Sequence, residues 1–223
     1  MSTDGRVVRL LLLCGVASPA LYATADAIAG SSWHGYSFRD QTISELGALG
    51  APSRAVFAVL LVPVYALLLA FGVGIWRSAE GRREIHALGA LVMGFATVAL
   101  TFGQFVPMHM RGVPQGLIGT LHLVEGGLVM LILLIAMIVA ALSLGKGFRD
   151  YTLATILVVL AFGAWSAAEA SRIELGLATP WVGVKERIFW YAYQVWFAVL
   201  ALVLFGQRRE GRSSQRVNSL RRR

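Results

Sequence analysis

Ionisable and hydroxyl side chains concentrate in three segments of a mostly apolar chain, at 31–54, 106–125 and 169–187. Three of the 4 histidines lie there. Imidazole nitrogens and carboxylate oxygens are the ligands that zinc takes in catalytic sites, which keep one position open for water. The pattern therefore suggests a site for zinc or another divalent metal, and the candidate ligands are His34, Asp40, His109 and His122.

A metal-bound water would need a general base, and Glu45 and Glu125 are the candidates for this role. Other polar residues of the same segments are candidates for binding a ligand. Arg111 or Arg187 would hold an anionic lipid or polyprenyl headgroup. The full set of candidate ligand-binding residues is Ser44, Arg111, Glu169, Arg172, Glu186 and Arg187. No HExxH sequence is present, so the metal ligands remain a hypothesis based on residue type.

The composition indicates a membrane protein. Hydrophobic residues make up 57% of the 223 residues and charged residues only 14%, against about 25% in soluble domains. A helix needs about 20 mostly apolar residues to cross the hydrocarbon core. We therefore predict an all-α integral membrane protein, a bundle of six transmembrane helices in one domain over 1–206, with a disordered basic tail at 207–223. The predicted helices are 7–29, 55–76, 86–106, 117–144, 152–171 and 188–205.

The distribution of charge predicts the orientation. Most of the 20 basic residues lie in the N-terminus, the second and fourth loops and the tail. The positive-inside rule places these parts in the cytoplasm, so both termini are expected inside the cell (cytoplasmic, inner) membrane. The three polar segments then face outward. Because the net charge of +8 is spread over loops and the tail, we do not expect nucleic acid as a partner; the expected partner is the lipid bilayer.

Three carboxylates fall at one depth. Asp26 follows a mostly apolar stretch of 19 residues, Glu125 precedes one of 19 and Glu169 follows one of 17, and 19 residues of helix span about 28 Å. Ionisable groups at this depth are functional candidates, although such groups also form ion pairs that fix helix packing. Arg172, three residues after Glu169, is placed to pair with it, and Glu125 shares a helix face with His122.

The segment YSFRDQTISELGALGAP at 36–52 resembles the signature of a family of bacterial and archaeal membrane proteins catalogued as domain of unknown function 998. The resemblance continues with Pro107 at the end of the third helix, His122 in the fourth, and Gly183 with Glu186-Arg187 before the last. Gln41 separates the aspartate and threonine that adjoin in many members, and Val106 replaces the usual Phe before the proline. The resemblance implies a six-helix fold and no particular activity.

Three functions remain open. The protein binds a lipid or polyprenyl headgroup, or supports a partner, through a polar pocket at the outer face. Alternatively, it is a metal-dependent membrane-embedded hydrolase that acts on an outer-leaflet lipid. In the third case, it is a small-solute or proton-coupled carrier, for which Asp26, Glu125 and Glu169 would relay protons. The sequence does not predict the oligomeric state.

Overall fold

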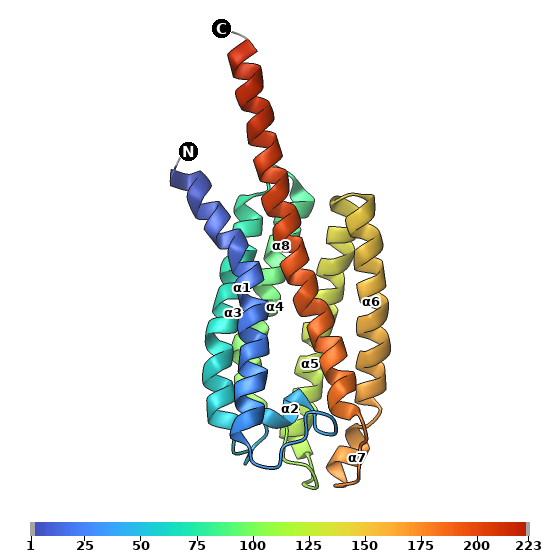
Figure 1. Ribbon diagram of the computed structural model, residues 1–223. Coiled ribbons are helices and arrows are strands. Elements are labelled where there is room, and N and C mark those ends of the chain that lie inside the picture. Colours follow the sequence, from blue (N-terminus) through green and yellow to red (C-terminus); the bar gives the residue numbers. More distant parts are fainter. Residues whose placement is uncertain (1–2, 222–223) are drawn as a thin grey trace.

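Six long helices and two short ones make up the computed structural model of the protein, which describes residues 3–221 and side chains as far as Arg208 (Figure 1). Their bounds are α1 (Thr3–Ser32), α2 (Ile43–Leu46), α3 (Arg54–Arg77), α4 (Arg83–Phe105), α5 (Gly116–Ser143), α6 (Lys146–Ala167), α7 (Ala170–Glu174) and α8 (Val182–Arg221).

The six long helices form a closed ring. Each packs against two others, in the order α1, α3, α4, α5, α6 and α8, and α8 returns to α1. Both described ends of the chain lie at one end of the bundle, and α2 and α7 lie at the other (Figure 1). We call these the tail end and the α2 end. A ring of six helices leaves room at its centre, which side chains must fill or leave as a cavity.

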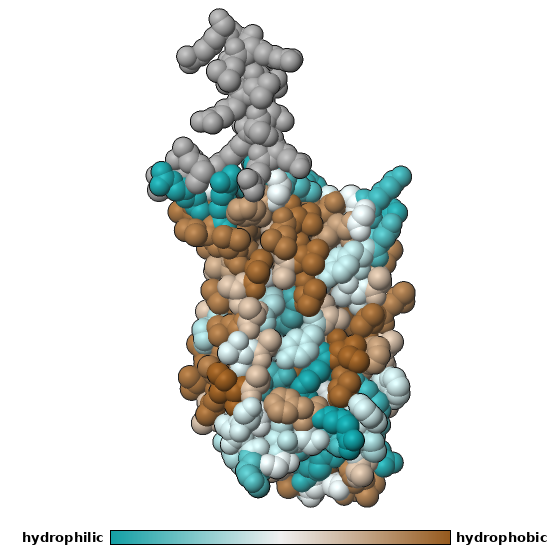
Figure 2. Space-filling view, viewed as in Figure 1, coloured by the Kyte–Doolittle hydropathy of each residue, from teal (hydrophilic) through white to brown (hydrophobic). Residues whose placement is uncertain are grey.

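All six long helices are long and apolar enough to cross a membrane, which confirms the predicted six-helix membrane protein. Hydrophobic side chains cover much of the middle of the bundle, and hydrophilic ones gather at the α2 end (Figure 2). Many of the large apolar side chains remain exposed, including Leu142 at 80% and Leu157 at 69%. Lipid is the solvent that accommodates such a surface, because a soluble monomer rarely exposes large continuous apolar patches. The cytoplasmic position of the tail end stays a prediction.

The last helix, α8, extends at both ends beyond the helix predicted from the apolar run at 188–205. It begins at Val182, where Gly183 donates a backbone hydrogen bond to the Arg39 carbonyl (3.0 Å) and so joins the first polar segment. It continues to Arg221, through a stretch for which the sequence predicts a disordered tail. That stretch contains no proline and one glycine and is rich in arginine, a strong helix former. Residues 222 and 223 lie outside the described residues.

Aromatic side chains fill the ring toward the tail end. Phe71, Phe197 and Trp196 are fully buried, and Phe95 is 1% exposed. The indole Nε1 of Trp196 donates to Thr152 Oγ1 at 3.0 Å, so this buried polar group is satisfied. The centre of the bundle is therefore closed at this level, and any cavity must lie nearer the α2 end.

Glycines allow α3 and α4 to pack closely. A Cβ atom built on Gly89 would lie 2.7 Å from the Trp76 backbone nitrogen, and one on Gly72 would lie 2.9 Å from the Met93 nitrogen. Because these neighbours are backbone atoms, they cannot move aside without separating the helices. Small residues at such crossings are typical of membrane helices, where close packing replaces the hydrophobic effect as the driving force.

We expect Gly89→Val to destabilise the bundle by about 1–3 kcal/mol, or roughly 2–12 °C in melting temperature, since the added atoms overlap with α3. Gly94→Val is the matched control on the same helix, because no atom lies within 4 Å of the position of its Cβ. Thermal unfolding of the purified protein in nanodiscs compares the two. Equal melting temperatures would show that the α3–α4 contact is not tight at Gly89.

Candidate functional site

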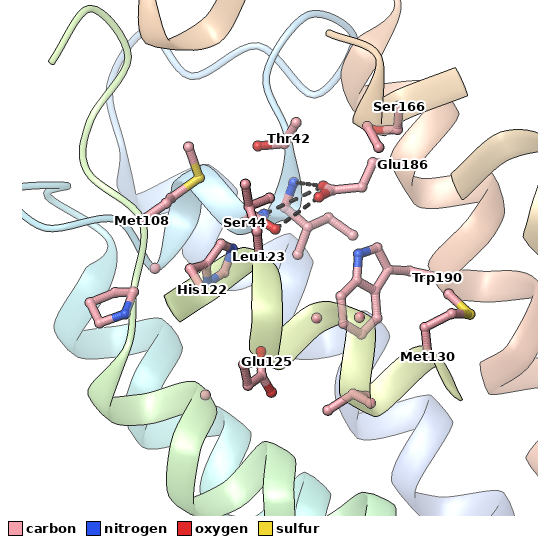
Figure 3. Close-up of a pocket in the computed structure, with 18 of the residues that line it drawn as sticks. Thr42, Ser44, Met108, His122, Leu123, Glu125, Met130, Ser166, Glu186 and Trp190 are labelled. Carbon is pink, nitrogen blue, oxygen red and sulfur yellow. Dashed lines mark hydrogen bonds between the residues drawn. The ribbon is translucent and has the colours of Figure 1, made fainter. Parts of the chain in front are cut away.

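The short helix α2 is tied to α8 through its own N-terminus. Thr42 and Glu45 form a capping box, in which the Thr42 backbone N–H donates to Glu45 Oε2 at 2.8 Å. The first backbone N–H of the helix, from Ile43, donates to Glu186 Oε2. Ser44 Oγ donates to Glu186 Oε1 at 2.8 Å. Glu186 of α8 thus holds α2 across the α2 end of the ring, as the dashed lines in Figure 3 show.

Glu45 is buried and paired with Arg111. The Arg111 Nε and Nη2 atoms each lie 3.0 Å from one of the two carboxylate oxygens. The same guanidinium donates to Thr179 Oγ1 at 2.8 Å and to the Leu177 carbonyl at 2.9 Å. The pair therefore joins all three polar segments. Because its carboxylate already accepts these bonds, Glu45 is poorly suited to act as a general base.

Asp26 and Arg187 form a second buried pair. Arg187 donates from Nη2 and Nε to the two Asp26 oxygens at 2.8 and 3.0 Å, and Tyr191 donates to Asp26 at 2.6 Å. Tyr36 accepts a bond from Arg187 and donates to the Thr42 carbonyl at 2.7 Å. Burial raises the pKa of Tyr36, so its phenol keeps the proton that it donates. Arg187 is thus engaged within the protein.

Glu169 pairs with two cations. Lys185 Nζ lies 3.0 Å from one carboxylate oxygen and Arg172 Nε lies 3.4 Å from the other. The predicted pairing of Glu169 with Arg172 is therefore observed. Asp26, Glu125 and Glu169, predicted at one depth, do not form a single cluster: two of them have separate cation partners, and Glu125 faces a cavity. The ion pairs join α1 to α8 and the start of α7 to α8.

A cavity of about 1060 Å³ lies inside the ring, beneath α2 (Figure 3). Its α2 side is lined by polar groups, among them Thr42, Ser44 and Glu186. Farther into the bundle the lining is mainly apolar. The residues that carry this apolar part include Leu61, Phe95, Val129, Met130, Leu133, Val159, Leu160 and Trp190. The cavity is thus amphipathic along its length.

His122 and Glu125 both line this cavity, as their shared helix face predicts. His122 Nδ1 lies 3.0 Å from the Val106 carbonyl, so the neutral ring carries its proton on Nδ1 and keeps Nε2 as an acceptor. The Glu125 carboxylate makes no hydrogen bond or ion pair within the described part of the chain, and no dashed line reaches it in Figure 3. Of the two predicted bases, Glu125 is the one with free acceptor atoms.

The four predicted metal ligands are not brought together. His34 is exposed in the turn after α1. Asp40 accepts from Arg39 and from the Trp181 backbone N–H at 3.0 Å. The His109 backbone donates to Gln115 Oε1, and His122 faces the cavity. Among the described residues, no group of three or more His, Cys, Asp or Glu side chains is arranged to hold a metal ion.

The comparisons with known proteins identify the family of the chain but give no activity. Residues 16–203 match the model of the family described as protein of unknown function (DUF998). The chain belongs to this family. No curated protein and no solved structure matches the chain. For this DUF998 protein, the family therefore supports a membrane protein of unknown function, and inferences about activity rest on the geometry of the cavity.

The residues on which the family resemblance was based have structural roles in this DUF998 protein. The ISELG stretch is α2 and its C-cap, and Gly183 admits the first polar segment onto α8. A Cβ on Gly183 would lie 2.2 Å from the Gln41 carbonyl oxygen, so only glycine fits there. These residues place α2 and the first polar segment over the α2 end of the cavity, and we call this cover the roof.

Sequence reasoning missed several residues of the site. Trp190 and Tyr193 line the cavity, and Tyr36 and Tyr191 complete the Asp26–Arg187 cluster. All except Tyr36 lie in an apolar run, where aromatic residues are typical of lipid contact or helix packing. The available signal was the position of Trp190 and Tyr193, four and seven residues after Glu186, which places all three on one face of the helix.

Breaking the Glu45–Arg111 pair should be costly. Their side chains are 1% and 21% exposed, and removal of one partner from a buried pair costs about 3–5 kcal/mol. We expect Arg111→Gln and Glu45→Gln each to lower stability strongly, and the double variant to lose much less than the sum. A double-mutant cycle of unfolding in detergent measures this coupling. Additive losses would indicate that the two side chains act independently.

Acid should weaken the attachment of the first polar segment to α8. The Arg39 guanidinium and the Trp181 backbone N–H hold the pKa of the Asp40 carboxyl below its usual range. A carboxyl group whose pKa is lower in the folded than in the unfolded protein stabilises the fold at pH values above its unfolded pKa, which is about 3.9 for aspartate. This stabilisation is lost as the pH falls through the folded pKa. We therefore expect the melting temperatures of wild type and Asp40→Asn to differ at pH 7 and to converge below pH 4.

Asp150→Asn, which removes a carboxylate from the tail end, is the control for this titration. A difference between wild type and Asp40→Asn that stays constant from pH 7 to acid would contradict the role assigned to Asp40.

Proposed function

We propose that the protein binds an amphipathic lipid or polyprenyl compound, with the head of the ligand in the polar part of the cavity and its chain in the apolar part. The observation that carries this proposal is the cavity of about 1060 Å³ within the helix ring, which is partly open to its surroundings. Ligand pockets commonly measure about 300–1,000 Å³ and combine an apolar lining with a few polar groups. A ligand with a chain suits both the size and the division of this lining.

Small residues keep the cavity open. Gly126 of α5 lines the cavity, and no atom lies within 4 Å of the position of its Cβ; the same holds for Gly127. Glycine in a helix costs about 1 kcal/mol relative to alanine, so its presence here needs a reason other than helix stability. At Gly72 and Gly89 that reason is close packing, but at Gly126 nothing packs against the backbone. Space for a ligand is the reason that we assign.

The geometry gives less support to the other two functions. A metal-dependent hydrolase needs three converging ligands, and the predicted ligands His34, Asp40, His109 and His122 lie apart. A carrier needs a polar path through the bundle, whereas Phe71, Trp196 and Phe197 fill the ring below the cavity. By the positive-inside rule, the α2 end faces outward from the cytoplasmic membrane, so the ligand would come from the outer leaflet.

Filling the cavity should abolish binding. Three probes share a 12-carbon chain brominated near its head, and the head is an alcohol, an amine or a phosphate. Bromine quenches tryptophan at short range, so the difference in fluorescence between wild type and Trp190→Phe reports on the cavity. We expect at least one probe to quench this Trp190 signal saturably in nanodiscs. Gly126→Leu should weaken that binding by about tenfold or more, which corresponds to about 1.4 kcal/mol.

Gly94→Leu is the matched control. It makes the same substitution in a spanning helix at a glycine that also has no atom within 4 Å of the position of its Cβ, but Gly94 itself does not line the cavity. It should leave quenching unchanged. Quenching that does not saturate for any probe, or that is equal in the two leucine variants, would refute the proposed function.

A further inference from the structure

Three polar groups of the cavity have no partner in the protein. The Glu125 carboxylate of α5 makes no hydrogen bond in the described part of the chain. In the same part of the chain, Trp190 Nε1 and Tyr193 Oη of α8 are buried atoms without a hydrogen-bond partner. Tyr193 is only 1% exposed. Buried polar groups in folded proteins are normally paired, so the two buried atoms of Trp190 and Tyr193, together with the half-buried and unpartnered Glu125, call for an explanation.

These groups lie at about the same level of the bundle. Glu125 comes nine residues after the start of α5, and Tyr193 comes eleven after the start of α8, which corresponds to about 13 and 16 Å of helix from the α2 end. In Figure 3 the indole nitrogen of Trp190 is on the side of the ring that faces Glu186. All three residues line the cavity, so a ligand that occupies this level of it would lie beside each of them.

The lining disfavours an anionic head. Arg111 and Arg187, the predicted anion-binding residues, are engaged by Glu45 and Asp26 and do not line the cavity. Arg54, the one arginine of the described lining, donates to the Gly47 carbonyl at 2.9 Å near the roof. The ionised form of Glu125 would repel a phosphate at low dielectric constant, and the described lining offers no cation other than Arg54 to offset the cost of moving an anion out of water.

The unpartnered groups instead require a ligand that both donates and accepts. Glu125 and the Nε2 atom of His122 are acceptors, so they need a donor from the ligand. Trp190 Nε1 is a donor only, so it needs an acceptor. An ammonium group only donates and a phosphate dianion only accepts, whereas a hydroxyl group does both. The hydroxyl also carries no charge that must leave water.

We propose that the ligand is a neutral lipid with a hydroxyl head, such as a long-chain or polyprenyl alcohol, and that Glu125 selects this head over a phosphate. The hydroxyl donates to Glu125 and accepts from Trp190 or Tyr193. The chain lies against the apolar residues farther into the bundle, beyond Met130. This inference rests on the proposed function and adds to it the class of the head and the residue that discriminates.

The three brominated probes test the head directly, with the full chain in nanodiscs and the Trp190 signal as the readout. We expect the wild type to bind the alcohol at least about tenfold more tightly than the phosphate, and more tightly than the amine. Glu125→Leu should weaken alcohol binding by about tenfold, since it removes the acceptor. Glu125→Gln keeps an acceptor oxygen and the shape but no charge. It should retain alcohol binding within about threefold and bind the phosphate more tightly than wild type does.

Each opposite result overturns the inference. Phosphate binding as tight as alcohol binding would show that the head is anionic, and tighter amine binding would show that Glu125 acts as a counter-ion. Unchanged alcohol binding in Glu125→Leu would place the head elsewhere. If Glu125→Leu unfolds, the phosphate affinity of Glu125→Gln decides alone. Saturable binding of the wrong head refutes only this inference, whereas a lack of saturable binding by all three probes refutes the proposed function.

Discussion

The hydrogen bonds between Glu186 and the N-terminus of α2 are the interaction on which the site depends. The first backbone N–H groups of a helix have no partner within it, and a carboxylate satisfies both their bonding and the positive end of the helix dipole. Because Glu186 belongs to α8, this one contact fixes a loop segment across the mouth of a six-helix ring. The roof of the cavity is therefore built from a polar contact between distant parts of the chain.

Two kinds of polar residue occur at the α2 end, and the structure separates them. Asp26, Glu45 and Glu169 each have a basic partner, and the Glu45–Arg111 pair connects the three polar segments to one another. These carboxylates are satisfied by partners within the protein. Glu125 is different because it has no partner and faces space. This contrast supports the proposal that Glu125, rather than the paired carboxylates, contacts a ligand.

Glycine also has two roles, which depend on its surroundings. At Gly72 and Gly89, backbone atoms of a neighbouring helix occupy the space where a side chain would lie. At Gly126 that space is empty and belongs to the cavity. The same residue type therefore brings helices together in one part of the ring and keeps them from filling the centre in another.

The sequence by itself determined the six-helix membrane fold, because about 20 apolar residues are needed to cross a bilayer and the chain has six such runs. It also indicated the helix face shared by His122 and Glu125 and the Glu169–Arg172 pair, since spacings of three residues are local. Residue type alone could not tell which ionisable groups are paired. Arg111 reaches Glu45 across 66 positions and Arg187 reaches Asp26 across 161, so only the tertiary structure decided that both arginines are engaged and that Glu125 is left facing the cavity.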